Sequence, residues 1–278
     1  MKLTKTTADI FLPSGDTLEA ALSSVTHLGI GAHQDDLEFM TVHGILQCFE
    51  APGTGFCGVT CTDGAGSPRS GDYARYTDDD MRVIRRKEQQ TAAQVGRYKA
   101  MFQLDYASKE LKGGVNPAAV ADLAAIIGAS RPKVIYTHNL ADRHPTHVGV
   151  AKQVIHALRE LLPGYKPEAF YGCEGWCDLD WMPHAHTQVL DVSAREHLAA
   201  ALSGAFDSQI AGGKRYDLAI LGRRRANATM FESHGVDQTT AATYAMDLMP
   251  LLDNPALTLA GYVEGIINDF RNEVFANL

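Results

Sequence analysis

The chain has no run of about 18 consecutive apolar residues, the length that a membrane-spanning helix needs. Its first residues also lack an apolar core followed by small residues, which is the pattern of a secretory leader. Cysteine is scarce: there are 5 among 278 residues, and this odd number argues against a framework of disulfides. We therefore expect a cytoplasmic protein.

Basic residues are outnumbered by acidic ones. Lys and Arg total 25, Asp and Glu total 33, and the formal net charge is −8. Binding to a nucleic-acid backbone or to anionic lipid relies on clustered Lys and Arg, so we expect neither nucleic acid nor membrane as a partner. Gly (25) and Pro (11) are too few for a low-complexity chain. The composition leaves a globular domain, and whether it forms a homo-oligomer is left open.

Short apolar runs alternate with helical patterns in the first part of the chain. This alternation predicts βαβ units and a Rossmann-like α/β fold, with a mostly parallel sheet and helices on both faces. Strands are predicted at residues 25–32, 56–61, 101–102 and 134–137, and helices at about 38–49, from 77 onward, at 117–127 and at 145–159.

After Pro163 the pattern changes. Residues 169–172 and 188–191 predict two further strands, and Ser193 with Glu196 predicts the capping box of a helix ending near Ile210. The rest of the chain, from residue 218, has a mostly helical pattern. We expect a single domain over residues 1–278, with a core at about 20–210 and a C-terminal helical and strand elaboration at about 211–278.

Polar clusters follow three of the predicted strands. They are residues 33–36, the Gly-rich loop 63–71 and residues 142–147. In an open parallel sheet, ligands bind outside the carboxyl ends of the strands. We therefore expect the three clusters to meet in one crevice.

The first cluster contains His33 and two adjacent carboxylates, Asp35 and Asp36. Adjacent side chains point in different directions, so one carboxylate can join His33 as a metal ligand while the other stays free as a base. A third ligand could come from His144 or His147, which share a face at a helix start. Two histidines and one carboxylate are the ligand set of a catalytic zinc, although the same set could hold ferrous iron.

The motifs resemble those of a known family. Residues 32–38 (AHQDDLE) resemble the AH-x-DD-x-E signature of the PIG-L/LmbE-like zinc-dependent N-deacetylases, and residues 142–147 (DRHPTH) resemble that family's D-x-H-P-D-H signature. Between them, residues 62–67 are similar to its Gly-rich loop and residues 85–88 to its R-x-x-E helix. The motifs occur in family order over about residues 25–158.

The resemblance implies specific roles. It makes His33, Asp36 and His147 the metal ligands, and Asp35 the general base. His144 would stabilise the oxyanion or protonate the leaving amine, and Arg85 would bind substrate. The implied reaction is removal of an N-acetyl group from a small molecule, an N-acetylglucosamine derivative, by an enzyme with one Zn²⁺ per chain, Fe²⁺ being the alternative ion. Acetate and a free amine are the products.

The chain departs from the family pattern at three positions. Gln34 stands where many relatives have Pro, Ala65 where the loop often has Glu, and Thr146 where the second signature has Asp. Thr146 bears on how His144 is oriented. Two other interpretations stay open: phosphoester hydrolysis in the same crevice, and a metal-retaining binding protein without turnover.

Three further features have ordinary structural interpretations. Four cysteines could form a zinc site, but three residues intervene within each pair where two are usual. Trp176 and Trp181 could stack on a sugar, although packing is the commoner role. Residues 223–225, three consecutive arginines, are most simply a solvated helix face, with an acidic subunit neighbour as the alternative.

Overall fold

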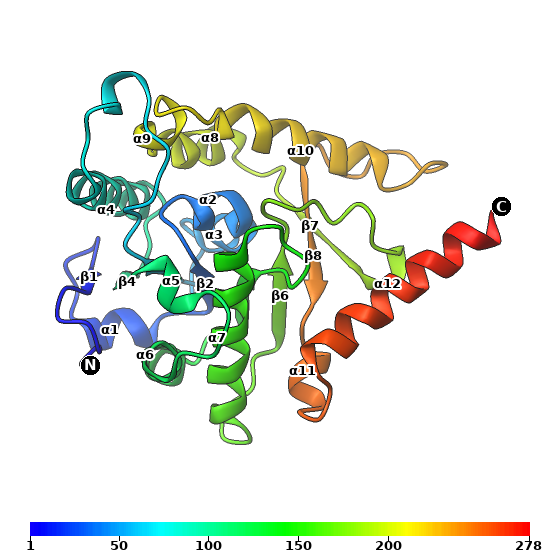
Figure 1. Ribbon diagram of the computed structural model, residues 1–278, viewed down its shortest axis with the longest axis horizontal. Coiled ribbons are helices and arrows are strands. Elements are labelled where there is room, and N and C mark those ends of the chain that lie inside the picture. The colour runs from blue at the N-terminus through cyan, green and yellow to red at the C-terminus, as the bar shows by residue number, and fades with distance from the viewer.

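The computed structural model describes all residues, 1–278, and is organised around one sheet of eight strands (Figure 1). Strands β4, β3, β2, β5 and β6 are parallel neighbours in that order, whereas β1 at one edge and β8 and β7 at the other are antiparallel. The predicted, mostly parallel α/β sheet is therefore confirmed. The strands are β1 (Asp9–Phe11), β2 (His27–Gly31), β3 (Phe56–Thr62), β4 (Ala100–Tyr106), β5 (Val134–His138), β6 (Ala169–Cys173), β7 (Thr187–Asp191) and β8 (Ala242–Asp247).

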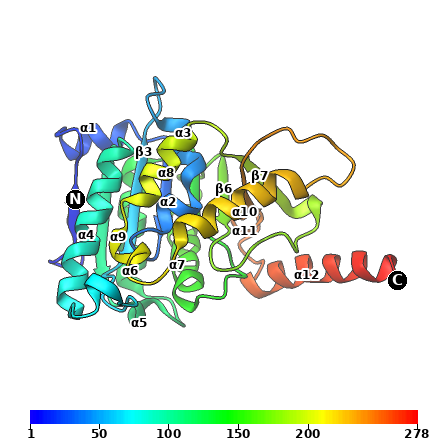
Figure 2. The same ribbon diagram turned by 90° about the horizontal axis from the view of Figure 1, so that it is seen from above.

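Helices cover both faces of the sheet, as the sequence predicts (Figures 1 and 2). A larger core packs α1 (Leu18–Ser23), α6 (Pro117–Ser130), α7 (Pro145–Leu161) and α11 (Pro250–Asp253) against one face. A smaller core packs α2 (Asp36–Met40), α3 (Val42–Cys48), α4 (Asp78–Val95) and α8 (Glu196–Gly204) against the other. The remaining helices are α5 (Ser108–Leu111), α9 (Asp207–Ile210), α10 (Tyr216–Met230) and α12 (Leu259–Ala276).

The helix starts follow the local sequence. Thr77 and Asp80 form the predicted capping box of α4, in which each satisfies a backbone N–H of the other. Asn116 caps α6, and Pro117 and Pro145 stand at the first position of α6 and α7, where a missing N–H costs nothing. The start of α7 matters most, because it carries the second polar cluster.

The second half of the chain departs from the predicted pattern. Ser193 does not cap a helix: its Oγ accepts hydrogen bonds from the backbone of Thr240 and Ala241, and α8 begins at Glu196. The helix predicted to end near Ile210 is two helices, α8 and α9. The region predicted as mostly helical contains β8, which inserts between β6 and β7. β8 is a short strand whose side chains are buried on both sides, so it lacks the alternation that marks a half-exposed strand.

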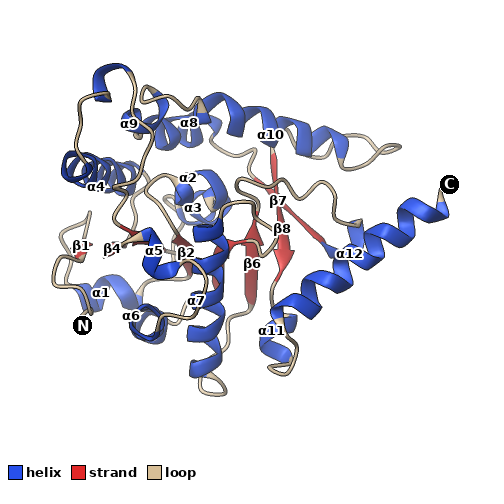
Figure 3. Ribbon diagram, in the orientation of Figure 1, coloured by secondary structure: helices blue, strands red, loops and turns tan.

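The C-terminal part belongs to the same sheet through β8, while α10 lies over the α2 and α8 side and α12 extends away from the sheet (Figures 2 and 3). The predicted boundary near residue 211 and the single-domain organisation stay predictions. No helix combines the length and the apolar character that crossing a membrane requires.

Candidate active site

The three polar clusters meet at the carboxyl ends of β2, β3 and β5, as the sequence predicts. They line a cavity of about 640 Å³, which also receives residues that follow β6 and residues of α10. The predicted site residues that line it are His33, Asp35, Asp36, Arg85, His144 and His147.

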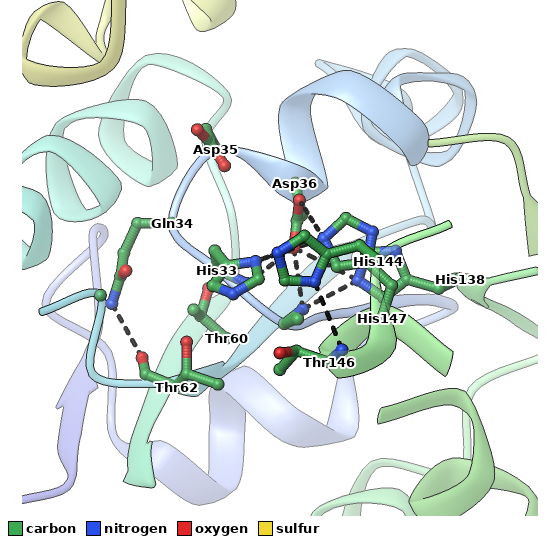
Figure 4. A network of polar contacts seen from close by, with 12 residues as sticks. His33, Gln34, Asp35, Asp36, Thr60, Thr62, His138, His144, Thr146 and His147 are labelled. Carbon is green, nitrogen blue, oxygen red and sulfur yellow. Dashed lines mark hydrogen bonds and ion pairs between the residues drawn. The ribbon is translucent and has the colours of Figure 1, made fainter. Parts of the chain in front are cut away.

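His33, Asp36 and His147 form a compact group that could hold a metal ion (Figure 4). Nε2 of His147 lies 3.2 Å from Nδ1 of His33. The two carboxylate oxygens of Asp36 lie 3.4 Å from these nitrogens, one from each. Burial opposes the charged form of Asp36, but the nearby His147 and His138 outweigh it and hold the pKa of Asp36 well below its ordinary value. Asp36 is therefore an ionised carboxylate aimed at two imidazoles.

The turn after β2 fixes Asp36 in this position. Oδ2 of Asp36 accepts hydrogen bonds from the backbone N–H groups of Ala32 (3.0 Å) and His33 (2.6 Å). Asp35 precedes it with a φ of 108°, outside the conformations that L-residues favour, and α2 begins directly afterwards. This backbone turn separates the two carboxylates, and Figure 4 shows Asp36 pointing toward the histidines and Asp35 away from them.

Asp35 lies on the cavity side of the turn, beside Arg85. Its Oδ2 is 3.5 Å from Nη2 of Arg85. Burial raises the pKa of Asp35 well above its ordinary value, and the guanidinium opposes that shift. Arg85 is itself held by Ser67 Oγ and the carbonyl of Gln34, so it joins the Gly-rich loop to the first cluster.

The Gly-rich loop packs directly on these residues. Gly64 has a φ of +72°, and an added Cβ would lie 2.4 Å from Oε1 of Gln34. Gln34 in turn donates to the carbonyl of Thr62 (3.0 Å). Gln34 therefore connects the first cluster to the end of β3, and the substitution from Pro is accommodated by hydrogen bonds.

His138 is a site residue that sequence reasoning missed. Its Nε2 lies 3.2 Å from Asp36 Oδ2 and accepts from the N–H of Ala32, and its ring stacks on His147 with centroids 3.8 Å apart. Burial lowers its pKa to about 4. His138, Asp142 and His147 form a second group that could hold a metal. The available signal was its place at the carboxyl end of β5, next to the strand of His33.

Asp142 lies next to the His147 ring, on the side of Nδ1. Its Oδ2 lies 3.4 Å from Nδ1 of His147 and accepts from the N–H of Trp176 (2.9 Å), while Oδ1 accepts from the N–H of His144 (2.7 Å). Burial disfavours charge on His147, but Asp36 and Asp142 outweigh it and raise its pKa. A carboxylate behind a ligating histidine is the usual arrangement at protein metal sites.

His144 is oriented by the backbone and not by a carboxylate. Its Nδ1 accepts a hydrogen bond from the N–H of Thr146 (3.3 Å), which makes His144 the N-cap of α7. Burial and the charge of His147 lower its pKa, and a ring that accepts at Nδ1 carries its proton on Nε2. The Thr146 side chain is fully buried, and its Oγ1 has no partner. Thr in place of Asp therefore leaves His144 held as a neutral imidazole.

The far wall of the cavity comes from the second half of the chain. Trp176, Lys214, Tyr216 and Arg223 line it, and the Tyr216 ring packs 5.4 Å from that of Phe39. Trp181 does not reach the cavity and packs on Phe270 of α12. This wall lies outside the motifs that the sequence analysis recognised.

Of the three consecutive arginines, Arg225 is exposed as expected, but Arg223 and Arg224 are not part of a solvated helix face. Arg223 lines the cavity, donates to the carbonyl of Gly175 and pairs with Asp178. Arg224 is buried and donates to the carbonyls of Glu38 (2.9 Å) and Phe39 (2.9 Å). The expectation failed for these two residues because α10 packs against α2, a long-range contact that helical periodicity does not encode. The cysteines form no zinc site: all five are free, and neither metal-capable group contains one.

A family comparison identifies the part of the chain that carries the clusters. The family model PIG-L, described as GlcNAc-PI de-N-acetylase, matches residues 28–158. Residues 28–158 are similar to this family, and we refer to them as the PIG-L segment. The PIG-L segment contains His33, Asp35, Asp36, His144 and His147, whereas the far wall of the cavity lies beyond it. No curated protein sequence matches the chain.

Solved structures share the fold. A conserved protein of Thermus thermophilus aligns 99% of its length with 84% of this chain (TM-score 0.64, 20% identity). The N,N'-diacetylchitobiose deacetylase of Pyrococcus horikoshii aligns 90% of its length with 87% of this chain (0.64, 16%). The 4-carboxy-2-hydroxymuconate hydratase of Pseudomonas putida aligns 96% with 81% (0.62, 17%). At these identities the likeness shows the fold, which hosts more than one reaction.

Proposed function

We propose that the protein is a metal-dependent N-deacetylase that uses zinc and removes an acetyl group from a small N-acetylated molecule, an amino-sugar derivative. The observation that carries this proposal is the pair of adjacent carboxylates. Asp36 faces His33 and His147 in a group able to hold a metal, while Asp35 faces the cavity. The PIG-L match and a fold shared with a diacetylchitobiose deacetylase support the choice of reaction.

The residues present fit a divalent metal. Two imidazole nitrogens and a carboxylate oxygen lie within 4.8 Å of one another, and Asp36 and His147 are buried. His147 has the carboxylate of Asp142 behind its other nitrogen. His33, Asp36 and His147 would hold the ion, as two histidines and one carboxylate do in catalytic zinc sites.

The chain's own residues supply the remaining chemistry. A metal bound there contributes Lewis acidity, which polarises an amide carbonyl and lowers the pKa of water. Asp35 is placed to accept a proton from the attacking water, because its carboxylate lines the cavity and lies beside Arg85, whose positive charge favours the ionised form. His144 carries a proton on Nε2 and can donate a hydrogen bond to the developing oxyanion. Arg85 contacts both Asp35 and Ser67 of the Gly-rich loop, and so fixes their positions relative to each other.

The cavity suits a substrate larger than an acetamide. A volume of about 640 Å³ falls in the range typical of small-molecule sites, ~300–1,000 Å³. Trp176 and Tyr216 give the far wall an aromatic character, which is common where a sugar ring binds. An amino sugar conjugate therefore fits the cavity, with its acetamido group at the base.

The proposal is tested by assaying three products with the zinc-loaded protein. Acetate and free amine should appear from N-acetylglucosamine derivatives, and phosphate should not appear from matched phosphoesters. Hydration of an unsaturated carboxylate, the reaction class of the Pseudomonas neighbour, should also be absent. Phosphate release or hydration without acetate would replace the proposal. Tight zinc binding without any of the three products would make the protein a metal-retaining binding protein.

A further inference from the structure

The charges that line the cavity are opposite in sign to the charge of the whole protein. The chain has a net charge of −8, yet the cavity is lined by four cationic side chains (Arg85, Lys112, Lys214 and Arg223) and by only two anionic ones, Asp35 and Asp36. Both aspartates already have roles at the proposed reaction centre. A cleft of one sign with apolar walls focuses the field on ligands of the opposite sign.

Two of the four cations are already engaged. The guanidinium of Arg85 donates to Ser67 and to the carbonyl of Gln34. That of Arg223 donates to the carbonyl of Gly175 and pairs with Asp178. These two arginines link segments of the cavity wall, and their guanidinium groups already have hydrogen-bond or ion-pair partners within the chain.

The other two are lysines without an acidic partner. Lys112 follows α5, and the end of α5 packs against α7 so closely that a Cβ on Gly149 would lie 2.1 Å from the carbonyl oxygen of Leu111. This contact places Lys112 beside the helix that carries His144 and His147. The Lys112 ammonium makes no ion pair or hydrogen bond within the chain, although it lines the cavity.

Lys214 precedes α10 and lines the same cavity. Its Nζ is 5.1 Å from the centre of the Trp176 ring, a cation–π contact that fixes where the ammonium lies. Trp176 is held by the bond from its backbone N–H to Asp142. Trp176 therefore positions Lys214, and the ammonium covers one face of the ring that could otherwise stack on a sugar.

We propose that the substrate carries an anionic group, a carboxylate or a phosphate, that binds to Lys112 and Lys214 while its acetamido group lies at the metal group. This inference rests on the proposed deacetylation for the position of the acetamido group. It adds a substrate class, acidic N-acetylated sugars, and two binding residues, one of which lies outside the PIG-L segment.

Binding of the deacetylated compounds tests the inference without any turnover. Calorimetry on the zinc-loaded chain would compare glucosamine with glucosamine 6-phosphate and with muramic acid, which carry a phosphate and a carboxylate. At least one acidic compound should bind more tightly than glucosamine, and the stronger of the two identifies the anion. Lys112→Gln and Lys214→Gln should each lower the affinity for that compound about 5- to 20-fold and leave the affinity for glucosamine unchanged.

Lys109→Gln is the matched control, because Lys109 is an exposed lysine of α5, three residues before Lys112, that does not line the cavity. Affinity for the acidic compounds should be unchanged in it. Equal binding of acidic and neutral compounds, or no binding of the acidic ones, would overturn the inference. So would a preference for the anion that persists in the double lysine variant, since the metal would then hold it.

The two proposals can fail separately. Acetate release from neutral and acidic N-acetylated sugars at equal kcat/KM, without any lysine effect, would remove the anion site and leave the deacetylase. A lysine-dependent preference for acidic ligands, with no acetate released from N-acetylglucosamine 6-phosphate or N-acetylmuramic acid, would remove the deacetylase and leave the anion site.

Discussion

Asp142 faces His147, not His144: its Oδ2 lies 3.4 Å from Nδ1 of His147, and it meets His144 only at the backbone N–H. The carboxylate therefore acts on a proposed metal ligand.

Asp142→Asn should weaken zinc binding about 10- to 100-fold, as loss of such supporting partners does. Chelator competition measures the affinity. Asp122→Asn changes a buried carboxylate remote from the site and should keep zinc affinity. Full zinc affinity in Asp142→Asn would show that the contact is structural only.

His144 and His147 should separate turnover from metal binding. His147→Ala removes a proposed ligand and should lose both zinc and acetate release. His144→Asn retains a side chain that can cap α7, so it should keep the fold and the zinc. It removes the Nε2–H donor, and kcat should fall about 10²–10⁴-fold. Zinc content and kcat of both variants decide the matter. An active His144→Asn would take this residue out of the mechanism.

The packing of α5 on α7 should tolerate no side chain at Gly149. Gly149→Ala places a Cβ 2.1 Å from the carbonyl oxygen of Leu111, so a helix must shift at a cost of about 1–3 kcal/mol in the free energy of unfolding. Gly128→Ala, within α6, meets its nearest atom at 3.5 Å and should be stabilising by up to ~1 kcal/mol. Denaturant unfolding of the two variants compares them. Equal stability would mean that α5 is free to move away from α7.

Glu174 should make stability depend on pH. Burial raises its pKa to about 7 from an ordinary 4.5, although Asn227 and the N–H of Tyr244 donate to it. The folded state then holds a proton that the unfolded state has lost, so stability falls as pH rises from about 4.5 to about 7 and levels off above. Glu174→Gln mimics the protonated form. The free energies of unfolding of Glu174→Gln and the parent should be nearly equal at pH 4.5. By pH 8 the variant should be more stable by on the order of 1–3 kcal/mol.

Thermal unfolding of the parent and of Glu174→Gln across this pH range checks that prediction. A constant difference in stability between the two proteins would contradict it. Glu168→Gln, a change at an exposed acid paired only with Lys133, serves as the matched control and should give a difference that does not grow with pH.

The first half of the fold was predictable because its signals are local. Apolar runs ending in polar residues located β2, β3 and β5, and the caps at Thr77 and Asn116 located helix starts. β8 was not predictable in the same way. It pairs with β6 and β7 from distant parts of the chain, and its burial on both sides removes the alternation.

The candidate site was also predictable only where its signals are local or follow from the order of the strands. Parallel strands bring His33 and His147 together whenever the polar clusters follow their carboxyl ends, so topology alone predicts the meeting. His138 was missed because one histidine at a strand end resembles a core residue. Trp176 was named only as a residue that could stack on a sugar, and Lys214 was not recognised, because the wall that they form depends on how α10 packs over the PIG-L segment. Tertiary contacts of that kind leave no periodic signal.

Asp35 and Asp36 are adjacent in sequence, and we propose that Asp36 binds the metal while Asp35 accepts the proton. Metal analysis and acetate release on Asp35→Asn and Asp36→Asn test it most directly, because both variants make the same chemical change one residue apart. Asp35→Asn should keep close to one zinc per chain and lose about 10²–10⁴-fold in kcat. Asp36→Asn should lose the zinc itself, since Asp36 faces His33 and His147. Equal loss of zinc from the two variants, or full activity of Asp35→Asn, would contradict the account.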